Sequence, residues 1–113
     1  MLTIYHNPRC SKSRQTLALI EDNNQEFTVV EYLKTPLSEG EIKNLLNLLT
    51  VTPIEMMRIK EAEFKEQNLK GADDDILISA MAKTPKLIER PIVVKGNKAI
   101  IGRPPENVLS LFQ

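Results

Sequence analysis

The stretch from Tyr5 to Arg14 holds the residues whose types and spacing best suit chemistry. Cys10 stands between a strand-like segment and a helical pattern that begins at Ser11. Helix N-termini present unpaired N–H groups and a partial positive charge, and both favour a thiolate over a thiol. The same N–H groups suit an oxyanion. Basic side chains add to this charge, at Arg9, Lys12 and Arg14. The pattern predicts a nucleophilic thiol beside an anion site, and the alternative is an inert cysteine that fills space.

Cys10 is the only cysteine, and Ser13 stands where a Cys-x-x-Cys protein has its second thiol. One cysteine forms no internal disulfide and no multi-cysteine zinc site, and the single histidine, His6, excludes a histidine metal cluster. If Cys10 is oxidised or modified during turnover, a thiol from outside the chain must restore it.

The composition indicates one ordinary globular domain. The chain has 113 residues, of which 42% are hydrophobic and 27% charged, and its 15 basic and 15 acidic side chains cancel. This balance gives no reason to expect nucleic acid or a membrane surface as a partner. No signal-peptide pattern and no apolar run of about 20 residues is present. We expect a cytoplasmic monomer with a reduced thiol.

Local patterns predict the order βαβ, several helices, then ββα. The two capping signals that carry most weight are Ser38 with Glu41, and the run Asp73–Asp75. We interpret the aspartate run as a helix start and not as a metal site, because three consecutive carboxylates do not converge on one ion. The expected strands are residues 2–5, 27–32, 91–94 and 99–101, and the expected helices begin near residues 11, 38, 53, 73 and 104.

Arginines form a second group of candidate site residues. Only five are present, against ten lysines, and Arg90 and Arg103 each directly precede a proline. A residue before proline is extended, so these side chains are held off a helix. The planar guanidinium suits a tetrahedral oxyanion. The alternative for each is a solvated surface arginine.

Four motifs stand in order along the chain. They are His-x-Pro-x-Cys with Ser-x-Ser-Arg at residues 6–14, Met-Met-Arg-Ile-Lys-Glu at 56–61, Glu-Arg-Pro-Ile-Val-Val at 89–94 and Ile-Gly-Arg-Pro-Pro-Glu at 101–106. With these motifs the chain resembles the glutaredoxin-coupled arsenate reductases of the thioredoxin-like superfamily, in their chromosomally encoded branch. The resemblance covers essentially the whole chain. Ile59 departs from it, since other members carry a polar residue there.

The resemblance implies an α/β thioredoxin-like fold, as a single domain over residues 1–113 with a helical insertion at about 37–88. It implies Cys10 as the nucleophile, a cis peptide before Pro91, and oxyanion binding by Arg58, Arg90 and Arg103. Supporting residues would be His6, Ser13, Arg14 and Pro91. His6 has two interpretations, as a protonated ring that favours the thiolate or as a side chain that stabilises the turn.

The implied activity is the reduction of arsenate to arsenite, with glutathione as co-substrate and glutaredoxin as partner. No metal and no bound cofactor is expected. Two alternatives stay open at this point. One is a glutathione-dependent thiol reductase without arsenate activity, against which the arginine set argues. The other is a redox-sensing regulator that binds RNA polymerase, whose usual Cys-x-x-Cys switch is absent because Ser13 replaces the second thiol.

Overall fold

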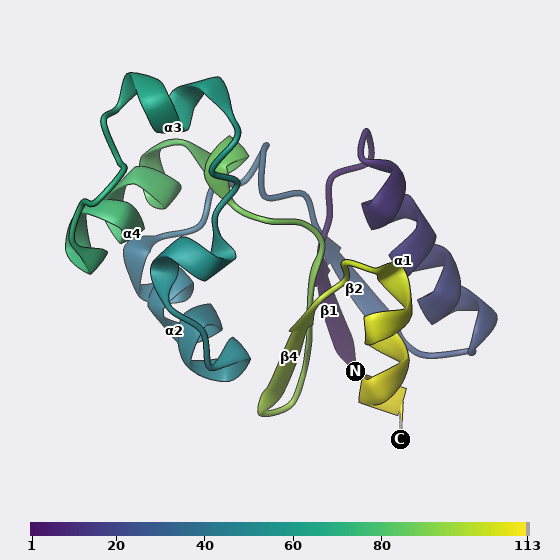
Figure 1. Cartoon of the computed structure of the whole chain (residues 1–113). Helices are drawn as coiled ribbons and strands as arrows, with labels where there is room; N and C mark the ends of the chain where they lie inside the picture. The colour runs from purple at the N-terminus through teal and green to yellow at the C-terminus, as the bar shows by residue number, and fades with distance from the viewer. Residues whose placement is uncertain (113) are drawn as a thin grey trace. The chain divides into compact units, whose positions relative to one another are not determined.

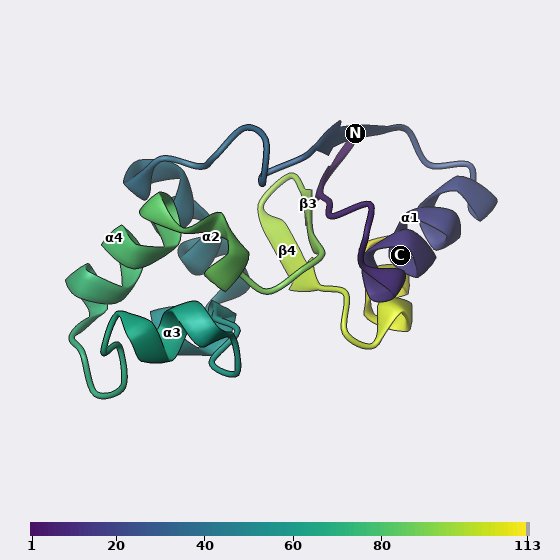
Figure 2. The same cartoon turned by 90° about the horizontal axis from the view of Figure 1, so that it is seen from above.

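A computed structural model describes residues 1–112 (Figures 1 and 2). The chain forms two compact units. Unit 1 consists of residues 1–35 together with the segment from Arg90 onward, and unit 2 spans Pro36–Glu89. None of the helices within residues 1–112 is both long enough and apolar enough to cross a membrane.

Unit 1 is built on a four-stranded sheet in the order β2-β1-β3-β4. The strands are β1 (Leu2–Tyr5), β2 (Phe27–Val30), β3 (Ile92–Lys95) and β4 (Lys98–Ile101). β1 pairs parallel with β2 and antiparallel with β3, and β3 pairs antiparallel with β4. Tyr5 is opposite Ile92, which is opposite Ile101. The chain therefore leaves β1, enters β3 and leaves β4 at one edge of the sheet.

Two helical segments cover one face of this sheet. Helix α1 (Ser11–Asp22) connects β1 to β2, and the 3₁₀ helix η3 (Pro105–Phe112) ends the described chain. Figure 1 shows them side by side, α1 in purple and η3 in yellow. Their buried side chains and those of the sheet form one apolar core, made of Leu2, Ile4, Ile20, Val93, Val108 and Leu111. Burial of this face fixes the orientation of α1 on the sheet.

Unit 2 is helical. Its elements are α2 (Glu39–Leu49), η1 (Pro53–Met56), α3 (Ala62–Glu66), α4 (Asp74–Lys83) and η2 (Pro85–Leu87). An isolated antiparallel bridge joins Met57 to Ile88. Two helix starts confirm the predicted caps: Ser38 and Glu41 form a capping box, and the Asp73 side chain accepts the Ile76 N–H at 3.0 Å. The Asp73–Asp75 run is therefore a helix start.

Three predicted elements differ from the structure. β2 ends at Val30 and not at Tyr32, because the N–H groups of Lys34 and Thr35 both donate to the Glu31 carbonyl and close a turn. The helices expected to begin near residues 53 and 104 are both of the 3₁₀ type, as η1 and η3. In η3, the Asn107 side chain donates to the carbonyls of Ile101 and Arg103, which precede the helix, an arrangement that competes with regular helical bonding.

Gly102 lets α1 approach the turns at the edge of the sheet. The Arg90–Pro91 peptide is cis, as the resemblance implies, and so is Arg103–Pro104, which was not expected. The Gly102 N–H donates to the Pro91 carbonyl at 2.9 Å. A Cβ at Gly102 would lie 2.6 Å from Thr16 Oγ1 and 2.8 Å from Pro91 Cγ, so only glycine fits between helix and turn.

We expect Gly102→Ala to lower the free energy of unfolding by about 1–3 kcal/mol, because the added methyl displaces Thr16 or Pro91. Gly40→Ala is the matched control. A Cβ there meets its nearest atom at 3.8 Å, so stability should stay constant or rise by less than about 1 kcal/mol. Denaturant unfolding measures both, and equal stabilities for the two variants would contradict the packing argument.

Candidate active site around Cys10

Cys10 is the N-cap residue of α1, and its side chain makes no capping hydrogen bond. The residue is 7% exposed, its N–H donates to the Asn7 carbonyl and its carbonyl accepts the Arg14 N–H, both at 3.0 Å. The first turn of α1 contains no acidic residue. Its N–H groups therefore have no capping side chain and no local carboxylate, an arrangement that suits a bound anion.

The loop before Cys10 is fixed by hydrogen bonds within the loop, to β2 and to α1. The Arg9 N–H donates to Asn7 Oδ1 at 3.0 Å, and the His6 N–H donates to the Val30 carbonyl at 2.9 Å. Arg14 donates through Nη1 to the Pro8 carbonyl at 2.9 Å. The structure thus gives Arg14 a role in holding the loop.

Ser13 and His6 connect this loop to the helix. His6 Nδ1 and Ser13 Oγ are 2.6 Å apart, and Ser13 Oγ also accepts the Asn7 N–H at 3.0 Å. Ser13 is fully buried and His6 is 7% exposed. Where a Cys-x-x-Cys protein has a second thiol, this chain has a hydroxyl that holds the loop.

The environment of His6 favours its neutral form. Burial lowers the pKa of the imidazole below its usual 6.5, the charge of Glu31 acts in the opposite direction, and Arg14 lowers it further. A neutral ring bonded to Ser13 agrees with the turn-stabilising interpretation. We therefore assign His6 to the support of the Cys10 loop.

Arg90 and Arg103 flank the same edge of the sheet as this loop. Tyr5, which precedes the loop, is opposite Ile92, and Ile92 is opposite Ile101. Arg90 Nε and Nη1 are buried and have no hydrogen-bond partner. Arg103 is exposed, and its N–H donates to the Ile101 carbonyl at 2.9 Å. Buried guanidinium N–H groups without a partner are costly, so Nε and Nη1 of Arg90 suit an anion from outside the chain.

Arg58 lies in unit 2, where carboxylates bind it. Its Nη1 is 2.7 Å from Glu61 Oε1, and its Nε is 3.6 Å from Glu89 Oε1. These two glutamates are not among the residues that the sequence predicts for the site. The spacing of three residues between Arg58 and Glu61 was the available signal.

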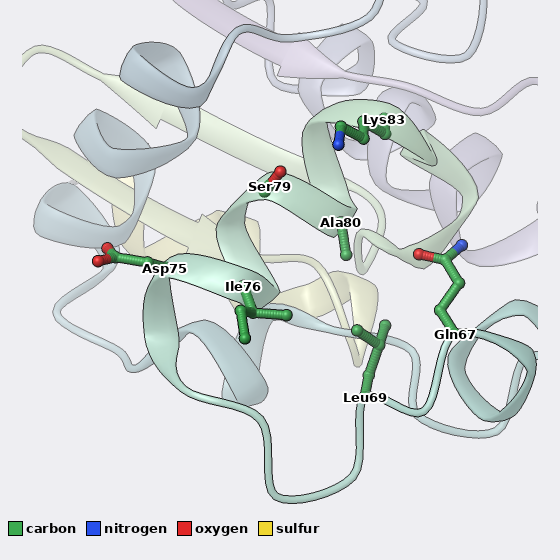
Figure 3. A pocket seen from close by; sticks show the side chains of 7 residues that line it. All are labelled: Gln67, Leu69, Asp75, Ile76, Ser79, Ala80 and Lys83. Atoms are coloured by element: carbon green, nitrogen blue, oxygen red, sulfur yellow. The ribbon is translucent and has the colours of Figure 1, made fainter.

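Pockets occur in both units. One of about 240 Å³ borders the Cys10 loop and is lined by His6, Asn7, Pro8, Arg9, Glu31, Leu33 and Lys34. Another, of about 420 Å³, lies along α4 in unit 2 and contains none of the predicted site residues (Figure 3). Within residues 1–112, no group of three or more His, Cys, Asp or Glu side chains could hold a metal ion.

The sheet order, the cis peptide before β3 and the cysteine at the start of α1 define a thioredoxin-like protein. The model of the ArsC family matches residues 5–111, and the chain belongs to that family.

Three relatives illustrate the similarity. The chain is 51% identical to the Escherichia coli K12 protein YfgD, whose name assigns no activity, over 96% of this chain and 93% of that one. It is 44% identical to an arsenate reductase of Neisseria meningitidis, over 95% and 94% of the two chains. A solved arsenate reductase from Vibrio cholerae is 51% identical with a TM-score of 0.93, over 96% of this chain and 95% of that one.

The lowered pKa of His6 predicts a loss of stability in acid. As the pH falls through 6.5, His6 becomes protonated in the unfolded chain, but in the folded chain its protonation needs a lower pH. The free energy of unfolding therefore decreases. His6→Asn keeps an acceptor for the Ser13 hydroxyl but does not titrate. Unfolding free energies at pH 7.5 and 5.5 should show a larger acid loss for the unaltered chain than for His6→Asn. Equal losses would contradict a buried neutral imidazole.

Proposed function

We propose that this protein is an arsenate reductase that uses glutathione and glutaredoxin, with Cys10 as its nucleophile. The observation that carries the proposal is the pair of buried, unpartnered nitrogens of Arg90, Nε and Nη1, at the sheet edge from which the Cys10 loop also leaves. The names of the Neisseria meningitidis and Vibrio cholerae relatives indicate arsenate as the oxyanion.

The anion site would combine arginine side chains with backbone donors. Arsenate is a tetrahedral oxyanion, and a guanidinium binds such an anion through parallel N–H groups. Arg90 offers Nε and Nη1, and the first turn of α1 offers N–H groups that no side chain caps. Arg103 follows β4 at the same sheet edge, and Arg58 is the third proposed ligand.

The reaction would proceed through two sulfur bonds. The Cys10 thiolate attacks arsenic(V), a water molecule leaves, and an S–As bond forms. The thiolate of glutathione then attacks Cys10 Sγ. The S–As electron pair goes to arsenic, arsenite(III) leaves, and a disulfide joins Cys10 to glutathione. The two thiols are oxidised by two electrons and the arsenic is reduced by two.

Regeneration must come from outside the chain. The sequence holds no second cysteine, and Ser13, at the position of a resolving thiol, is buried against His6. Glutaredoxin would attack the glutathione sulfur of the mixed disulfide, releasing the Cys10 thiolate and carrying the glutathione away.

A coupled assay tests this proposal. Arsenate, glutathione, glutaredoxin, glutathione reductase and NADPH are supplied, and NADPH oxidation is followed. We expect arsenate-dependent oxidation that requires both glutathione and glutaredoxin, and none with Cys10→Ser. Equal turnover with thioredoxin alone and no glutathione would overturn the proposed coupling, and absence of arsenate reduction with every component present would overturn the activity.

Arg90→Lys tests the anion site. Lysine keeps the charge but loses the planar pair of donors, so we expect kcat/KM for arsenate to fall by about tenfold or more while the circular dichroism spectrum is unchanged. Arg9→Lys is the control, because the Arg9 side chain is exposed, and its kcat/KM should change by less than about twofold. Equal kcat/KM values for the two variants would remove Arg90 from the site.

A further inference from the structure

Arg58 differs from Arg90 because its guanidinium has two carboxylate partners. Glu61 Oε1 lies 2.7 Å from Nη1 and Glu89 Oε1 lies 3.6 Å from Nε, and neither contact uses Nη2. The three side chains are partly buried, at 25%, 18% and 26% exposure for Arg58, Glu61 and Glu89. Ion pairs at this depth are less screened than those on an open surface.

The backbone around these side chains is fixed as well. The Arg58 N–H donates to the Leu87 carbonyl at 2.7 Å, and the Glu89 N–H donates to the Met56 carbonyl at 2.8 Å. These two bonds lie on either side of the Met57–Ile88 bridge, so Arg58 and Glu89 lie on two short segments that pair antiparallel. The Glu61 N–H donates to the Arg58 carbonyl at 3.2 Å and closes the turn that follows.

A second cation holds Glu61 in turn. Lys86 Nζ lies 3.6 Å from Glu61 Oε2, so the two oxygens of this carboxylate face two different cations. The same Nζ is 3.5 Å from Glu63 Oε2. Glu63 therefore shares the network through Lys86, but no salt bridge joins it to Arg58.

We propose that Glu61 and Glu89 are positioning residues that hold the Arg58 guanidinium in one orientation for the oxyanion. The inference rests on the proposed function, in which Arg58 is an anion ligand. A free arginine side chain loses much rotamer freedom when it binds, and an arginine already held by two carboxylates loses less. Nη2 remains for the anion. The cost of this arrangement is that the negative charges of Glu61 and Glu89 repel that anion.

Glu61 could affect anion binding in two ways, by orienting Arg58 or by repelling the anion, and the two effects predict opposite changes in affinity when Glu61 is substituted. Glu61→Gln keeps a carbonyl oxygen that accepts from Nη1 but removes the charge, whereas Glu61→Ala removes both. If positioning dominates, Glu61→Gln binds the anion as tightly as the unaltered chain does, and Glu61→Ala binds it more weakly. If repulsion of the anion dominates, both substitutions tighten binding.

The test measures arsenate affinity by calorimetry in the full chain carrying Cys10→Ser, where no turnover occurs. We expect Glu61→Ala to raise Kd by about tenfold, the factor that an arginine's rotamer freedom implies, and Glu61→Gln to stay within about threefold. Glu63→Ala, the matched control, should leave Kd unchanged. In an Arg58→Ala background, Glu61→Ala should have no further effect, because Glu61 acts through Arg58.

The outcomes separate this inference from the proposed function. Arsenate that binds with the expected variant pattern but is not reduced by the unaltered chain would overturn the reductase and leave the positioning role intact. Tighter binding in Glu61→Gln, an effect of Glu61→Ala that persists without Arg58, an equal effect of Glu63→Ala, or no arsenate binding at all would each overturn the positioning role.

Discussion

The hydroxyl of Ser13 is the contact on which the candidate site depends. It lies in the first turn of α1, 2.6 Å from the His6 ring, and it accepts the N–H of Asn7. The loop that leads to Cys10 is therefore bonded to the helix that Cys10 begins. Because the Cys10 side chain does not cap that helix, the helix N–H groups are left for another acceptor. The burial that makes the Ser13 contact effective also lowers the pKa of His6, so a neutral ring and an ordered loop have the same cause.

Two arginines with the same predicted role have opposite surroundings. Arg90 is half-buried, and its Nε and Nη1 are buried without a partner, which is a cost to the folded chain that a bound anion would offset. Arg58 is paired with Glu61 and Glu89, so its charge is already balanced and its orientation is restrained.

Local signals in the sequence predict much of the fold. The Ser38–Glu41 capping box and the Asp73 cap are read from side chains that bond within three residues, so sequence alone contains the information. The predicted end of β2 at Tyr32 was wrong. The turn at Glu31 is closed by backbone hydrogen bonds, and no turn-forming residue in the sequence marks it. The cis peptide at Pro91 came from the family resemblance. The Arg58–Glu89 pair joins residues distant in sequence, and the Ser13–His6 bond joins a loop to a helix, so no helix or turn pattern predicts either contact.

In the proposed reaction, Cys10 becomes joined to glutathione only through arsenate. The sharpest test is intact-mass spectrometry after a single turnover, with the chain, glutathione and arsenate present and glutaredoxin left out. We expect one glutathione per chain, located on Cys10 by peptide mapping and absent when arsenate is omitted. An unmodified Cys10 after arsenite has formed, or the same adduct in the absence of arsenate, would contradict it.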